Sequence, residues 1–260
     1  MKGSAAVNEF LKEYISERDY AAVAGRAADW IAAWFEKNGK DSPVVIGISG
    51  GKDSTVVAAL CVRALGKERV FGVLMPNGLQ PDIGTSYDVV KTLGIKYAEI
   101  NIDEAYDGVV ASMRGAGIEP GTQTLVNLAP RIRMSTLYAV SQSLGGRVSN
   151  NGNRSERYVG YMTVWGDTAG DFAPLAGLTV TEVRLVGEAL GLPTRFVHKP
   201  PSDGLTGKTD EDNLGFSYET LDTYILTGVC PDADARRLID AKHRANLFKT
   251  LPTASFDPGC

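Results

Sequence analysis

The chain has 260 residues, of which 43% are hydrophobic and 22% are charged, and its formal net charge is -4 at pH 7. This length and composition allow a large hydrophobic core, and we expect a single domain. The negative charge gives no electrostatic footprint for nonspecific binding of nucleic acid, so we expect no nucleic-acid partner. The three cysteines show no C-x-x-C spacing, which argues against a zinc site and a disulfide framework.

The hydrophobic runs of the chain are short. The N-terminus lacks the apolar core of a signal peptide, and no apolar run approaches the roughly 18 residues that a membrane helix needs. We therefore expect a soluble, cytoplasmic protein with no membrane partner.

Strand and helix patterns alternate along most of the chain. Residues 5–38 carry apolar side chains at helical spacing and end at Asn38 and Gly39, which predicts an N-terminal helix. Short apolar runs predict strands at 43–46, 69–75, 96–102 and 146–149. Helical patterns separate them, at 54–60, at 83–93, at 103–113 and from about 122. This alternation predicts an α/β fold with a doubly wound, mainly parallel sheet flanked by helices.

The C-terminal part combines loops with further helices. The glycine-rich segment 160–175 predicts a substrate loop, and the polar segment 198–210 predicts a loop that closes over the site. Helices are expected at 179–190, 218–227 and 232–248. The single domain, 1–260, thus divides into an N-terminal helix at about 5–38, an α/β core at about 43–200, and a C-terminal loop and helices at about 200–250.

The turn at residues 47–54 carries the strongest functional signal. It reads Gly-Ile-Ser-Gly-Gly-Lys-Asp-Ser and connects a predicted strand to a predicted helix. Paired glycines let the backbone approach an anion closely, and the amides at a helix start carry partial positive charge. The Walker and G-x-G-x-x-G patterns both fail, since Asp53 stands where the first needs Ser or Thr and the glycines lack the second's spacing. The turn therefore predicts a different phosphate-binding loop; the alternative is an ordinary turn capped by Asp53 and Ser54.

A second polar turn, residues 150–156, follows the predicted strand at 146–149. Two such turns at strand ends can face each other across a nucleotide. Arg131 and Arg133 lie on a segment that otherwise looks buried, where an arginine usually has a carboxylate or phosphate partner.

Five motifs occur in order along the chain: Ser49–Ser54, Arg131 with Arg133, Gly152–Glu156, Gly166–Leu175 and Lys199–Ser202. Together they resemble the NAD synthetases, and the similarity runs from about residue 22 to about residue 252. The resemblance implies a Rossmann-like ATP pyrophosphatase fold. It also implies that deamido-NAD (nicotinate adenine dinucleotide), ATP and ammonia give NAD, AMP and pyrophosphate through an acyl adenylate. No glutaminase-type domain accompanies the motifs, so the form implied uses free ammonia, and it is a homodimer.

The same resemblance implies roles for individual residues, although it assigns none as catalytic. The residues implied to bind ATP are Gly47, Ile48, Ser49, Gly50, Gly51, Lys52, Asp53, Ser54, Asn151 and Ser202. Those implied to bind deamido-NAD are Arg131, Asp171, His243 and Arg244. Asp53 and Glu156 are implied to hold Mg²⁺ near the phosphates. The alternatives are a surface carboxylate for Glu156, an internal ion pair for Arg131 and an ordinary helix-surface side chain for His243.

Two positions depart from the family pattern. Val164 and Val180 stand where the family usually has lysines, so two cations that would offset substrate charge are missing. We hypothesise that Lys199, Lys208 or Lys52 supplies this charge instead.

Two other functions are compatible with the phosphate-binding turn. One is another adenylating amide or sulfur transferase of the same superfamily, although a sulfurtransferase would need a reactive cysteine pair and a basic face, and neither is visible. The other is a nucleotide sensor without catalysis. A sensor has little need of the two carboxylates at Asp53 and Glu156, because it stabilises no departing pyrophosphate.

Overall fold

The computed structural model describes residues 2–199, 209–257 and 259, with side chains from residue 9 onward. The strands are β1 (Val44–Gly47), β2 (Val70–Leu74), β3 (Lys96–Glu99) and β4 (Arg147–Val148). The helices are α1 (Lys2–Ser16), α2 (Tyr20–Asn38), α3 (Lys52–Leu65), η1 (Lys67–Arg69), α4 (Ile83–Leu93), α5 (Asp103–Gly115), α6 (Thr122–Leu144), α7 (Arg154–Val159), α8 (Val180–Ala189), α9 (Thr194–Val197), α10 (Asp210–Leu214), α11 (Tyr218–Thr227), α12 (Ala233–Asn246) and η2 (Leu247–Thr250). In this described part of the chain, no helix has the length and apolar character needed to cross a membrane.

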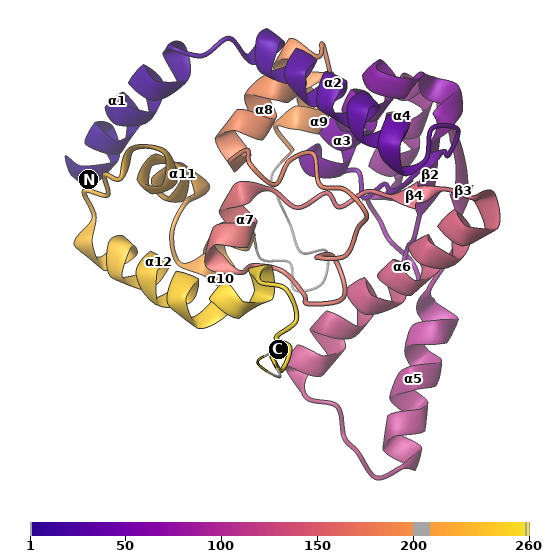
Figure 1. Cartoon of the computed structure of the whole chain (residues 1–260). Coiled ribbons are helices and arrows are strands. Elements are labelled where there is room, and N and C mark those ends of the chain that lie inside the picture. Colours follow the sequence, from indigo (N-terminus) through magenta and orange to yellow (C-terminus); the bar gives the residue numbers. More distant parts are fainter. Residues whose placement is uncertain (1, 200–208, 258, 260) are drawn as a thin grey trace.

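The four strands form a parallel sheet in the order β3-β2-β1-β4. Val44 of β1 pairs with Val70 of β2 on one side and with Arg147 of β4 on the other. After β1 the chain extends the sheet through β2 and β3 and then returns to the free side of β1 with β4. Figure 1 shows the strands between α2 and α3 on one side and α6 on the other. The strand order therefore reverses beside β1, and open parallel sheets bind ligands at the carboxyl ends of the strands at such a point. The predicted doubly wound α/β fold is confirmed.

Each face of the sheet has its own hydrophobic core. Val44 and Ile46 of β1 lie in a cluster with side chains of α2, α3 and α8. Val45, between them, lies on the other face with Val73 of β2, against α5 and α6. Alternate residues of a strand point to opposite faces, so both faces of β1 are buried and its sequence is continuously apolar.

The N-terminal segment corrects one prediction. A single helix at about 5–38 is wrong, because α1 ends at Ser16 and α2 begins at Tyr20. The carboxylate of Asp19 accepts hydrogen bonds from the amides of Ala21 at 2.9 Å and Ala22 at 3.0 Å. Asp19 is thus the N-cap of α2, and a residue in this role has non-helical backbone angles that end the preceding helix.

The segment that follows Gly170 runs beside β4. The amide of Asp171 donates to the carbonyl of Val148, and the amide of Asn150 donates to the carbonyl of Phe172, both at 2.8 Å. A Cβ atom at Gly170 would lie 2.5 Å from the backbone nitrogen of Asn150. Only glycine therefore fits at position 170 without moving the backbone that follows β4.

We expect Gly170→Ala to lower the free energy of unfolding by about 1–3 kcal/mol, the usual cost of overpacking a close contact. The added methyl group would displace the Asn150 backbone. Chemical denaturation measures this change. Gly177→Ala is the control, since a Cβ there meets no atom within 4 Å. Equal stability of the two variants would contradict the close packing at Gly170.

Candidate active site

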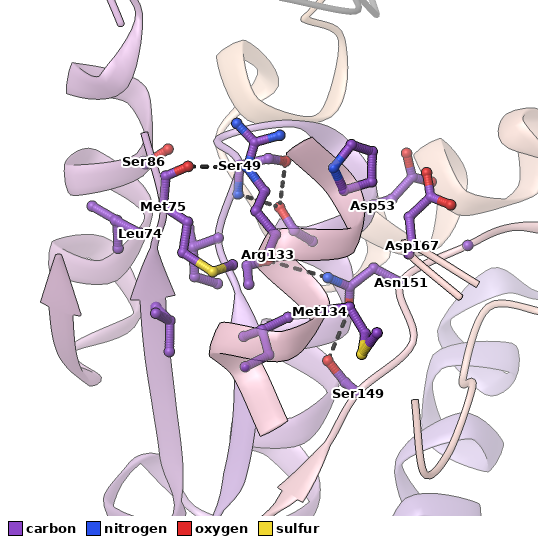
Figure 2. Close-up of a pocket in the computed structure, with 18 of the residues that line it drawn as sticks. Ser49, Asp53, Leu74, Met75, Ser86, Arg133, Met134, Ser149, Asn151 and Asp167 are labelled. Carbon is purple, nitrogen blue, oxygen red and sulfur yellow. Dashed lines mark hydrogen bonds between the residues drawn. The ribbon is translucent and has the colours of Figure 1, made fainter. Parts of the chain in front are cut away.

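A pocket of about 530 Å³ lies at the carboxyl ends of β1, β2 and β4. Its walls come from the β1–α3 turn, the β2–α4 connection, one face of α6, the β4–α7 turn and the loop that precedes α8 (Figure 2). These segments are far apart in the sequence. The reversal of strand order beside β1 brings them together.

The β1–α3 turn has the geometry of an anion-binding loop. Gly50 has φ +74°, and a Cβ atom there would lie 3.0 Å from the amide nitrogen of Ser86, so the tight turn requires glycine. The hydroxyl oxygens of Ser49 and Ser54 lie 3.1 Å apart at the mouth of the turn. Gly51, and not Asp53 or Ser54, is the N-cap of α3, and it provides no side-chain cap. The first amides and the positive dipole end of α3 therefore have no side-chain cap and are available to bind an anion.

The β4–α7 turn meets the β1–α3 turn, as predicted. The side-chain amide of Asn153 donates to Asp53 Oδ1 at 3.0 Å, and that of Asn151 donates to the carbonyl of Gly47 at 3.2 Å. Asn153 also caps α7 together with Glu156, in a reciprocal capping box. This box fixes Glu156 on the pocket wall, so the alternative of an ordinary surface carboxylate does not hold.

Charged groups gather on one side of the pocket. Asp53 and Asp167 lie on the same side in Figure 2, and Glu156 also lines the pocket. Lys52 Nζ donates to Asp53 Oδ2 at 2.8 Å from a side chain that is only 3% exposed. Burial lowers the pKa of Lys52, but the charges of Asp53 and Glu156 outweigh that effect and raise it overall, so Lys52 is an ammonium.

Two carboxyl groups of the pocket have raised pKa values. Desolvation and then repulsion by Asp53 raise the pKa of Glu156, although part of its surface is accessible. Desolvation by the surrounding protein also raises the pKa of Asp167, whose side chain reaches the open space of the pocket. Asp53 and Glu156 are the pair of oxygen donors that could hold a metal ion. Across residues 2–199, 209–257 and 259, no three His, Cys, Asp or Glu side chains group as a metal site.

Most of the residues predicted to bind ATP lie at the pocket. Its wall includes Gly47, Ile48, Ser49, Asp53, Ser54 and Asn151, and also Glu156, which was predicted as a metal ligand. Gly50, Gly51 and Lys52 belong to the same turn but lie behind the wall. Ser202 lies outside the described residues.

The four residues predicted to bind deamido-NAD lie outside the pocket wall, as far as the described residues define that wall. Arg131 is exposed, and its Nε donates to the carbonyl of Val164 at 3.2 Å. Asp171 Oδ2 accepts from the amide of Val148 at 2.8 Å. The His243 ring stacks on the Tyr158 ring at a centroid distance of 4.2 Å, and Arg244 is exposed at the end of α12.

Sequence reasoning assigned no role to several residues of the site, chiefly Arg133, Asn153 and Asp167. Arg133 lines the pocket, and its Nε donates to the carbonyl of Met75 at 3.0 Å. Helical spacing could have identified Arg133, because the pocket face of α6 consists of Pro130, Arg133, Met134 and Leu137. These positions are spaced i, i+3, i+4 and i+7, which excludes position 131 from the same face.

The sequence and the fold are similar to those of known proteins. The model of the NAD synthase family matches residues 23–249. The NH3-dependent NAD+ synthetase of Pyrococcus furiosus is 43% identical over 189 residues, which cover 72% of each chain. The structure is similar to that of the NMN synthetase from Francisella tularensis, with a TM-score of 0.84, 29% identity, and coverage of 94% of this chain and 100% of that one. It is also similar to the NH3-dependent NAD synthetase from Campylobacter jejuni, with a TM-score of 0.75, 29% identity, and coverage of 92% and 100%.

The raised pKa of Glu156 predicts how the stability of the metal-free protein depends on pH. The folded-state pKa of about 8 lies above the value of about 4.3 for an unfolded glutamate. The folded state therefore holds the extra proton between these values. The contribution of Glu156 to the free energy of unfolding is fully present below about pH 4 and is lost as the pH rises to about 8.

Thermal unfolding at a series of pH values, with a chelator present, measures this effect. Glu156→Gln should flatten the decline in stability with rising pH. Glu36→Gln is the control, since Glu36 is an exposed residue of α2 that pairs with Lys40, and it should keep the wild-type profile. An unchanged slope in Glu156→Gln would show that another group controls the decline.

Proposed function

The chain belongs to the NAD synthase family, and we propose on this basis how its pocket performs the family's reaction. The protein is a ligase that forms a carbon–nitrogen bond: ATP, deamido-NAD and ammonia give NAD, AMP and pyrophosphate. Family membership sets aside the alternatives of a sulfur transferase and a nucleotide sensor. The observation that carries the mechanism is the meeting of the β1–α3 and β4–α7 turns in one pocket.

The reaction needs ATP because a carboxylate oxygen is a very poor leaving group. The nicotinate carboxylate first attacks the α-phosphorus of ATP, and the bond from that phosphorus to the pyrophosphate oxygen breaks. Ammonia then attacks the carbonyl carbon of the acyl adenylate, the bond from carbon to the AMP oxygen breaks, and the nitrogen loses a proton. The protein therefore has to bind a triphosphate, stabilise the departing pyrophosphate and accept a proton.

The β1–α3 turn is placed to bind the outer phosphates. The first amides of α3 are hydrogen-bond donors already in place as charge develops on pyrophosphate. The hydroxyls of Ser49 and Ser54, which bond to each other and from Ser54 to the carbonyl of Gly51, add donors when they turn toward the phosphates. Arg133 adds a guanidinium to the pocket wall, from α6. These groups provide much of the positioning that phosphoryl chemistry requires.

We include Mg²⁺ in the proposal because the donor set fits it. Asp53 and Glu156 present two carboxylates beside the phosphate-binding turn, and Mg²⁺ usually binds one or two carboxylates together with substrate phosphates. With Mg²⁺ held there, the negative charge of the phosphates is offset during bond cleavage.

Asp167 is the residue that we propose as the proton acceptor for ammonia. Its side chain reaches the pocket, on the same side as Asp53 (Figure 2). Its raised pKa makes it a better proton acceptor than an ordinary carboxylate. The amide of Thr163 donates to its Oδ1 at 2.7 Å and fixes its orientation.

We extend the proposal to a cytoplasmic homodimer. The resemblance supports the dimer, and the use of ATP supports the compartment. Arg131, Asp171 and Arg244 are exposed and lie away from the pocket wall, so a role in binding deamido-NAD needs a surface beyond the ATP pocket. A second subunit would provide such a surface.

A second candidate acceptor is nicotinate mononucleotide, which would give NMN. The NMN synthetase from Francisella tularensis has a higher TM-score to this chain than the Campylobacter jejuni NAD synthetase, 0.84 against 0.75, at the same identity. Val164 also leaves one cation fewer beside Arg131, where the larger dinucleotide would need charge compensation. The chemistry at the reacting carboxylate is the same for both acceptors.

We expect the purified protein with ATP, Mg²⁺ and ammonium to convert deamido-NAD to NAD, and to release pyrophosphate over many turnovers only when both acceptor and ammonium are present. Chromatography of the products, with each acceptor supplied in turn, measures this. A higher kcat/KM for nicotinate mononucleotide would move the assignment to NMN formation. Pyrophosphate release without either acceptor would contradict both assignments.

We expect Asp167→Asn to slow amide formation by about 100-fold or more, the usual contribution of a general base. The adenylation half-reaction, measured as exchange of labelled pyrophosphate into ATP with acceptor but without ammonium, should stay near the wild-type rate. Asp107→Asn, on the exposed part of α5, is the control. An equal loss of exchange and amide formation would show that Asp167 does not act on ammonia.

A further inference from the structure

Lys52 has an arrangement that the proposed reaction does not by itself explain. It is the first residue of α3, and its side chain is buried, although a lysine at the start of a helix ordinarily extends into solvent. Its Nζ lies 2.8 Å from Asp53 Oδ2 and 5.7 Å from the centroid of the Tyr218 ring on α11. The ammonium is therefore enclosed between a carboxylate and an aromatic face.

Lys52 has no direct access to a ligand in the pocket. Among the described residues, the pocket wall includes Asp53 and Glu156 but not Lys52. The lysine therefore acts through Asp53, as a positioning residue. The two oxygens of Asp53 both have partners, because Asn153 Nδ2 donates to Oδ1 at 3.0 Å while Lys52 occupies Oδ2.

The charge at this site is low for a divalent cation. The ammonium of Lys52, 2.8 Å from Asp53 Oδ2, offsets the negative charge of that carboxylate. The described chain supplies no third His, Cys, Asp or Glu side chain to the group. Mg²⁺ seeks six oxygen ligands and loses its water reluctantly, so these two carboxylates offer too little without the oxygens of a phosphate chain.

We propose that Lys52 is an internal counter-ion of Asp53 that keeps the site weak for free divalent cations, so that the metal binds only together with ATP. This inference rests on the proposed metal site at Asp53 and Glu156. It also predicts the order of binding. The metal enters with the nucleotide as a complex or binds after the nucleotide, and it does not bind first. It also gives Lys52 a role different from that of the lysines absent at Val164 and Val180, since it offsets protein charge and not substrate charge.

Binding of Mn²⁺, followed by its electron paramagnetic resonance signal, tests the inference without measuring activity. The nucleotide-free wild type should bind Mn²⁺ about 100-fold more weakly than the complex with a non-hydrolysable ATP analogue, because the phosphates supply most of the ligands. Lys52→Met should bind Mn²⁺ about tenfold or more tightly than wild type in the absence of nucleotide, since one nearby positive charge is removed. Lys40→Met, at an exposed lysine of the same charge, should match wild type.

Tight Mn²⁺ binding by the nucleotide-free wild type would overturn the inference, and so would equal affinities for wild type and Lys52→Met. If Lys52→Met does not fold, Lys52→Gln, which also removes the charge, takes its place with the same expected gain, and Lys52→Arg, which keeps the charge, should retain weak binding. Asp53→Asn separates the two proposals. If Asp53→Asn leaves Mn²⁺ binding with the analogue unchanged, the metal site itself is wrong. If it weakens that binding while Lys52→Met equals wild type, only the role of Lys52 is wrong.

Discussion

The site depends on hydrogen bonds between distant parts of the chain, above all the one from Asn153 Nδ2 to Asp53 Oδ1. The bond forms because β4 pairs with β1, so that the turns after both strands leave the sheet side by side. If β4 were added beyond β3, its turn would start about 14 Å from that of β1, at about 4.8 Å per strand. The strand order is therefore the constraint that creates the pocket. The sheet therefore determines where the side chains of the pocket lie.

The distribution of charge follows from this geometry. The pocket wall carries the acidic residues Asp53, Asp82, Glu156 and Asp167 and the arginines Arg133 and Arg157, while the buried ammonium of Lys52 is not part of it. A phosphate chain entering such a pocket meets helix amides, hydroxyls and two arginines as donors. The carboxylates repel it unless a cation lies between them. A site of this composition suits a reaction in which nucleotide and metal are bound together.

Sequence patterns predicted the parts of this structure that depend on local periodicity. The bounds of α4 and α11 agree with the predictions at 83–93 and 218–227, since apolar spacing and helix stops are local signals. The break before α2 was missed because apolar spacing continues through it, and only the bonds to Asp19 reveal the cap.

The motifs also located the two turns, and the rule for reversed strand order placed them face to face. They did not identify which arginine lines the pocket, because the pattern contains both. The motifs also gave no indication of the buried Lys52–Asp53 ion pair, because Tyr218, which covers the lysine, comes from α11, a distant part of the chain.

The position of Glu156 is set from the core as well as from the pocket. Ser155, the preceding residue of α7, donates its hydroxyl to the buried Asp222 of α11 at 2.5 Å and accepts the amide of Val180 at 3.0 Å. Asp222 also accepts the amide of Thr181 at 2.7 Å, while burial raises the pKa of its carboxyl group. Val180 itself is buried among apolar side chains of α7, α10 and α11, so this position contributes packing and not a cation. On one side, α7 presents the carboxylate of Glu156 to the pocket. On its other side, a buried hydrogen-bond network holds the helix in place. Loosening that network would therefore move Glu156 even if no residue of the pocket were changed.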